Sequence, residues 1–118
     1  MDALWQALQG LRVPMQQGEY DLHRLVAACL ESQGIEYIHE ARLGPRCRID
    51  FLCGGVGLEL KRGKPNRTQL LAQLARYADC EQVSGLIVIA ERSVDLPHTL
   101  RGKPLRVLCL NRLWGIAL

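Results

Sequence analysis

The segment from Arg46 to Arg62 constrains the fold more than any other part of the chain, because it has the pattern of a β-hairpin. Two strand-like runs, Arg46–Cys53 and Val56–Arg62, flank Gly54-Gly55, which tolerates the positive φ angles of a two-residue turn. Alternation predicts one apolar face made of Ile49, Phe51, Cys53, Val56, Leu58 and Leu60. The other face then carries Arg48, Asp50, Leu52, Gly57, Glu59 and Lys61.

In this register Asp50 lies directly opposite Glu59, and two carboxylates so placed repel each other. Either Lys61 or a divalent cation offsets that repulsion, since Mg²⁺ prefers one or two carboxylates plus water and phosphate oxygens. An exposed sheet face with interleaved charges is the alternative interpretation. Leu52 and Gly57 argue against it, because neither suits a solvent face and Gly57 leaves room for a ligand or a backbone close by.

The rest of the chain predicts one α/β domain with a mixed central sheet flanked by helices. Helical patterns cover residues 3–9, a segment from Gly18 to a C-terminal cap at Gly34, and a segment from an N-cap at Asn66 through Cys80. Further strand-like runs are Ile35–Leu43, Ser84–Ala90 and Leu105–Leu110. The predicted order is therefore α, α, β, β, β, α, β, β.

Composition excludes several classes of protein. The 48% hydrophobic fraction is enough for a buried core, and no run approaches the about 18 apolar residues of a membrane helix. The five cysteines are odd in number and contain no CxxC pair, which argues against disulfides and a zinc site. With no signal-peptide pattern either, we expect a soluble, cytoplasmic protein without disulfides or membrane contact. The histidines form no ligand pattern along the chain: His23, His39 and His98.

Charge is unevenly distributed. Residues 1–60 carry five Arg and eight Asp or Glu, a net of −3, whereas residues 61–118 carry ten Lys or Arg and four Asp or Glu, a net of +6. The densest basic stretch holds Lys61, Arg62, Lys64 and Arg67. An acidic spot beside a basic loop is typical of a metal-dependent phosphodiester site, although a solvated surface is the alternative.

The hairpin resembles the core of a known family. Ile49-Asp50, eight intervening residues and Glu59-Leu60-Lys61 resemble the D…ExK core of the PD-(D/E)XK nuclease superfamily, with Ile49 in place of the nominal proline as in resolvase-like members. The resemblance covers residues 18–90 in the order helix, three-strand meander, helix, strand. It implies a single restriction-endonuclease-like domain over residues 1–118, with the helix at 3–9 and the strand at 105–110 added to that core.

Two further positions are similar to the family. Glu19 matches an acid that many members carry in the first helix, although the helix dipole also favours an acid there, and Glu40 is a competing candidate for the extra acid. Gln73 and Tyr77 resemble the QxxxY motif of RecB-type members, in which both residues lie beside the metal site and contact the nucleic-acid backbone. With Gln69 at i−4, the spacing predicts one polar stripe opposite Leu71, Leu74 and Ala78.

The resemblance implies a divalent-metal-dependent nuclease that hydrolyses phosphodiester bonds of DNA, endonucleolytic and either structure-selective or nonspecific. The implied catalytic residues are Asp50, Glu59, Lys61 and Gln73. The implied ligands of Mg²⁺ or Mn²⁺ are Asp50, Glu59, the main-chain carbonyl of Leu60 and, through water, Glu19. The implied DNA-binding residues are Arg62, Lys64, Arg67, Gln69 and Tyr77. The cysteines do not match those of iron–sulfur relatives, so no cluster is expected, and a homodimer stays open.

Two other functions stay open at this stage. One is a nuclease-fold module without activity that binds nucleic acid or a partner protein. The other is a small α/β interaction domain whose acidic and basic side chains form surface ion pairs. Metal-dependent cleavage of DNA distinguishes the nuclease interpretation from both of these functions.

Overall fold

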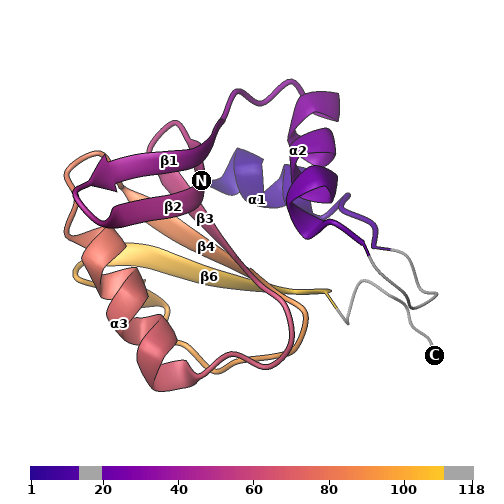
Figure 1. Ribbon diagram of the computed structural model, residues 1–118. Coiled ribbons are helices and arrows are strands. Elements are labelled where there is room, and N and C mark those ends of the chain that lie inside the picture. The colour runs from indigo at the N-terminus through magenta and orange to yellow at the C-terminus, as the bar shows by residue number, and fades with distance from the viewer. Residues whose placement is uncertain (14–19, 111–118) are drawn as a thin grey trace.

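The computed structural model describes residues 1–13 and 20–110 (Figure 1). Within these ranges the helices are α1 (Asp2–Leu8), α2 (Leu22–Ser32) and α3 (Arg67–Ala78). The strands are β1 (Ile38–Gly44), β2 (Cys47–Cys53), β3 (Val56–Lys61), β4 (Gly85–Ala90), β5 (Thr99–Leu100) and β6 (Lys103–Cys109).

The six strands form one mixed sheet in the order β1-β2-β3-β4-β6-β5. β1, β2 and β3 are an antiparallel meander, β3, β4 and β6 are parallel, and the two-residue β5 is antiparallel to β6. Helices α1 and α2 pack on one face of the sheet and α3 packs on the other (Figure 1). The predicted α/β domain with a mixed sheet is confirmed, and β5 is an element that the sequence pattern did not predict.

Two predicted helix ends are confirmed. Gly34 follows α2 with a φ of +71°, and the main-chain N–H of Ile35 donates to the Leu30 carbonyl at 2.9 Å, which closes the helix in a left-handed cap. The Asn66 side chain accepts a hydrogen bond from the Gln69 main-chain N–H at 3.0 Å and so begins α3. Helix α2 begins after Asp21, which caps it, and not directly after Gly18 as predicted. Gly18 and Glu19 lie outside the described residues.

The predicted hairpin register is confirmed for the pairs Cys53↔Val56, Leu52↔Gly57 and Phe51↔Leu58. The predicted single apolar face is wrong at Ile49, which packs in the cluster under α3, whereas Phe51 packs under α1 and α2. Glu40 of the neighbouring strand has a φ of +53°, and the β1–β2 register passes from His39↔Phe51 to Ala41↔Ile49 without a Glu40↔Asp50 pair. Across this break the register is unchanged, yet Phe51 and Ile49, two residues apart, point to opposite faces of the sheet.

The space beside Gly57 is filled by the core side chain of Ile49. The prediction that Gly57 leaves room for a ligand is therefore wrong. A Cβ atom at Gly57 would lie 2.3 Å from Ile49 Cδ1 and 3.1 Å from Leu86 Cδ2. Leu52 also packs against the cluster beneath α3. The sheet face that carries these residues is therefore largely covered by α3, and the interpretation as an exposed sheet face is wrong there.

None of the helices among the described residues is long and apolar enough to span a membrane. The five cysteines all lie within the described ranges, and none is in a disulfide.

We expect Gly57→Ala to lower the free energy of unfolding by about 1–3 kcal/mol, because the new methyl group overlaps Ile49 Cδ1 in a packed core. Urea denaturation measures the loss. The same substitution in an Ile49→Val background, which lacks Cδ1, should cost less. Gly44→Ala is the matched control, since a Cβ at Gly44 meets nothing within 4 Å. Equal losses at Gly57 and Gly44 would contradict the packing described.

Candidate active site

The candidate site begins where strand β2 passes beyond its last register pair with β3. Past Phe51↔Leu58, the main-chain N–H of Leu60 donates to Asp50 Oδ2 at 2.7 Å. Glu59 and Leu60 meanwhile pair with Val88 and Ile89 of β4. Asp50 is therefore held against β3 by its carboxylate, and one of its two oxygens is engaged by a main-chain donor.

Glu59 is the one buried charged residue of the described ranges, with 4% of its surface exposed. Its Oε2 accepts from Lys61 Nζ at 3.2 Å, while Oε1 is buried without a hydrogen-bond partner among the described residues. Burial, followed by the negative charge of Asp50, raises the pKa of Glu59 to about 7, while Lys61 and then the nearby Tyr77 hydroxyl oppose this rise. A buried acceptor without a partner costs about 1–3 kcal/mol, so the site favours a hydrogen-bond donor or a cation that reaches Oε1.

The oxygen atoms at this point are suited to a hard divalent cation. Asp50 and Glu59 supply carboxylates from adjacent strands, and Leu60 adds a main-chain carbonyl between Glu59 and Lys61 along β3. Mg²⁺ and Mn²⁺ prefer oxygen ligands of these kinds. These residues fit such an ion because Glu59 Oε1 is buried and has no hydrogen-bond partner among the described residues.

Tyr77 does not continue the predicted polar stripe of α3. Its side chain is 3% exposed and packs with Leu74 and Ala78, whereas Gln69 is exposed and Gln73 is half-buried. At about 100° per residue, eight residues turn a helix by about 80° beyond two full turns, which carries Tyr77 away from the direction of Gln69 onto the buried face.

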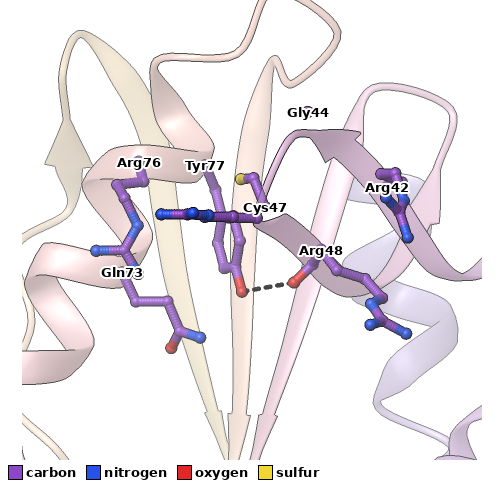
Figure 2. A pocket seen from close by; sticks show the side chains of 8 residues that line it. Arg42, Gly44, Cys47, Arg48, Gln73, Arg76 and Tyr77 are labelled. Carbon is purple, nitrogen blue, oxygen red and sulfur yellow. Dashed lines mark hydrogen bonds between the residues drawn. The ribbon is translucent and has the colours of Figure 1, made fainter.

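The Tyr77 hydroxyl belongs to the buried surroundings of the carboxylates. It donates to the Arg48 main-chain carbonyl at 2.9 Å (Figure 2). Burial, and then the negative charges of Glu59 and Asp50, raise the pKa of Tyr77 above its usual value. In this structure Tyr77 joins α3 to β2 beside the site, and its side chain is buried.

Two pockets lie on either side of Gln73 and Arg76, which line both of them. The first, of about 350 Å³, is enclosed by α3 and the β1–β2 hairpin (Figure 2). Its other lining residues are Arg42, Gly44, Arg46, Cys47, Arg48 and Tyr77. The second pocket, of about 390 Å³, is also lined by Lys61, Pro65, Asn66, Gln69 and Leu70. The structure thus brings the predicted site residues Lys61, Gln69 and Gln73 around one hollow.

The basic residues predicted from the loop after β3 are placed differently. Arg62 donates to Glu91 Oε2 at 3.0 Å and lies over the Tyr20 ring, 4.0 Å from its centroid. Arg67 donates to the Asp95 carbonyl at 2.6 Å, and Lys64 is exposed. Two of the three predicted phosphate-binding cations are therefore engaged within the protein.

The densest group of arginines lies instead around the first pocket: Arg42, Arg46, Arg48 and Arg76. Sequence reasoning missed this group because Arg76 comes from α3 and the other three come from the β1–β2 hairpin. One indication was present in the sequence. A hairpin about Gly44-Pro45 pairs Arg42 with Arg48, two like charges that are unfavourable together, and Arg48 is already paired with Glu40 Oε1 at 3.2 Å.

The prediction that the histidines form no ligand group is wrong for His23 and His39, which lie in contact. His23 Nδ1 lies 2.9 Å from His39 Nε2, and His23 Nε2 lies 3.9 Å from Asp50 Oδ1. Of the two candidates for the extra acid, Glu19 is outside the described residues, and Glu40 lies beside His39. The two histidines are sixteen positions apart in the chain, so no spacing rule indicated their contact.

Comparisons with family models, curated proteins and solved structures give no match for this chain. The site is therefore interpreted from its own geometry.

Glu59 makes stability depend on pH. Its pKa is about 7 in the folded protein and about 4.5 in the unfolded chain, so the folded state binds the proton more tightly. The free energy of unfolding should therefore fall as pH rises from about 4.5 to about 7, by up to about 3 kcal/mol, and then level off. Glu59→Gln stays neutral and lacks this fall.

Urea denaturation at pH 5 and pH 8 in EDTA measures the effect. We expect the stability of Glu59→Gln relative to the parent to increase by about 1–3 kcal/mol between these pH values. The exposed Glu81→Gln is the matched control and should show a constant difference. A constant difference for Glu59→Gln as well would contradict the raised pKa.

Proposed function

We propose that this protein is a divalent-metal-dependent nuclease that hydrolyses phosphodiester bonds of DNA, built on a restriction-endonuclease-like fold of the PD-(D/E)XK type. The observation that carries the proposal is the buried Glu59 Oε1, which has no hydrogen-bond partner within 3.5 Å among the described residues although Asp50, Lys61 and the Tyr77 hydroxyl lie near the carboxylate. The order of helix, three-strand meander, helix and strand around these residues supports the same proposal.

The chain's own groups have distinct tasks in this reaction. Asp50 is held in place by the Leu60 N–H before any ligand arrives, and Glu59 is fixed by burial and by Lys61. Bound at these carboxylates, Mg²⁺ or Mn²⁺ supplies the positive charge that polarises a phosphodiester and acidifies a water molecule.

Lys61 and Gln73 face the second pocket, where a phosphodiester has room to lie. The Lys61 ammonium is 3.2 Å from Glu59 Oε2 and partly exposed, so it is positioned to orient the attacking water and to stabilise charge that develops on the phosphate. The Gln73 amide lies between the two pockets and positions a substrate oxygen by hydrogen bonding.

The arginine-lined pocket supports DNA as the substrate. It adjoins the second pocket, because Gln73 and Arg76 line both. A phosphate backbone that crosses these two residues would meet arginines in the first pocket and Lys61 in the second. Contacts of arginine with phosphate position a backbone without reading base sequence. This favours nonspecific or structure-selective cutting. The same pocket favours the second candidate function, a nuclease-fold module that binds DNA without cutting it.

The test is cleavage of labelled linear duplex, single strand, flap, four-way junction and supercoiled plasmid with Mg²⁺, Mn²⁺ or EDTA. We expect metal-dependent cutting that falls on the order of 10²–10³-fold in Lys61→Ala and Asp50→Asn, because each loses a charge at the reacting phosphate. Glu81→Gln is the control and should cut like the parent. Cutting that persists in EDTA or in both variants would contradict the proposal, and binding without cutting would favour the second candidate.

Arg76→Gln should weaken binding of duplex DNA and reduce the salt dependence of the binding constant by about one phosphate contact, since Arg76 lines both pockets. Arg24→Gln is the matched control, because it makes the same charge change on α2, across the sheet from α3. Fluorescence anisotropy at several salt concentrations measures both. Equal effects of the two substitutions would contradict a DNA path along α3.

A further inference from the structure

A second group of metal-binding side chains lies on the other side of Asp50, between α2 and β1. His23 Nδ1 is 2.9 Å from His39 Nε2, and His39 Nε2 is 4.0 Å from Glu40 Oε2. One potential ligand atom from each of the three residues lies within 4.8 Å of the others. We infer that His23, His39 and Glu40 bind a transition-metal ion of the Zn²⁺ class, at a site chemically distinct from the oxygen ligands of Asp50 and Glu59.

The two imidazoles already lie with one nitrogen of each ring against the other. Without a metal, one ring N–H donates to the other ring nitrogen across their 2.9 Å separation. Two nitrogens bound to one tetrahedral Zn²⁺ at about 2.0–2.1 Å are about 3.3 Å apart. To admit the ion, the two nitrogens need to separate by about 0.4 Å and the rings need to turn toward the ion.

Phe51 holds both rings in place. The His39 ring stacks on the Phe51 ring with a centroid separation of 4.7 Å, and the His23 centroid is 5.9 Å from that of Phe51. Phe51 itself is fully buried in the core under α1 and α2. The two histidines thus rest on a rigid support, which reduces the entropy lost when they bind a common ion.

Glu40 is the third ligand, and its backbone is unusual. Its φ of +53° lies in the left-handed region, which is rarely populated by a residue other than glycine, asparagine or aspartate. Arg48 engages Glu40 Oε1 at 3.2 Å, which leaves Oε2 on the side of His39. A charged partner on the second oxygen of a ligating carboxylate is the kind of outer contact that orients metal ligands.

Asp50 gives His23 a similar partner. With the ion on Nδ1, the remaining proton of neutral His23 lies on Nε2, which is 3.9 Å from Asp50 Oδ1. A ligating histidine in a zinc site commonly donates its second N–H to a carboxylate, and a closer approach of Asp50 Oδ1 to His23 Nε2 would form that hydrogen bond. The side chains of His23 and His39 are 37% and 44% exposed, so an ion can enter from solvent. Two imidazoles and one carboxylate select Zn²⁺ over Mg²⁺, which takes oxygen ligands.

The experiment is titration of the metal-free full chain with Zn²⁺ by calorimetry, and with Co²⁺ by visible absorption, in excess Mg²⁺ to occupy oxygen sites. We expect one bound ion and a Co²⁺ spectrum without thiolate charge-transfer bands. Affinity should fall at least about 10–100-fold in His39→Ala, because removing a ligand costs no less than removing an outer contact. His23→Asn on the surface of α2 is the second variant, in case His39→Ala fails to fold, and circular dichroism checks both.

His98→Ala is the matched control, since His98 is exposed and outside the group. It should bind Zn²⁺ like the parent, and so should Glu59→Gln, which alters only the oxygen site. No binding by the parent, or equal binding by the His23 and His98 variants, would overturn the inference. The Zn²⁺ titration contains no nucleic acid, so it tests this site independently of the proposed nuclease function. A protein that binds Zn²⁺ but cuts no DNA would support this site and contradict the nuclease proposal.

Discussion

The hydrogen bond from the Leu60 main-chain N–H to the Asp50 carboxylate, at 2.7 Å, is the contact on which the rest of the site depends. It fixes one carboxylate against β3 where the β2–β3 register ends. Next to it on β3, Glu59 is buried, so two acids share a poorly solvated space and the pKa of Glu59 rises to about 7. Lys61 contacts only Oε2 of Glu59, and Oε1 is left without a hydrogen-bond partner among the described residues. A cation at that point stabilises an arrangement that the protein alone leaves unfavourable.

The break in the meander at Glu40 and Asp50 organises both sides of the sheet. Because of it, Ile49 turns toward α3 and fills the space left by Gly57, while Phe51 turns toward α2 and supports the two histidines. Asp50 lies at the boundary, with one oxygen on the Leu60 N–H and the other facing His23. The oxygen site and the histidine group therefore lie on the two sides of this break, and a separate register shift between Arg42 and Gly44 lies at the arginine-lined pocket.

Local patterns predicted what local interactions determine. The turn at Gly54-Gly55 set the hairpin register, and the Asn66 side chain set the start of α3. Alternation failed at Ile49 because it assumes an unbroken strand, and nothing in the sequence marks Glu40 as left-handed. Helical spacing failed at Tyr77 because the stripe drifts over eight residues. The arginine-lined pocket and the paired histidines arise from packing between distant segments, which neither composition nor spacing records.

The most direct test of this account is the anomalous difference density of a crystal grown with Mn²⁺ at pH 8. The account predicts an ion bound by Asp50 and by Glu59 Oε1, with Lys61 still on Glu59 Oε2. Carboxylates without an ion, with Glu59 Oε1 hydrogen-bonded to another protein group, would contradict it. An ion confined to the histidine group would contradict it equally, because the buried acids would then require no cation.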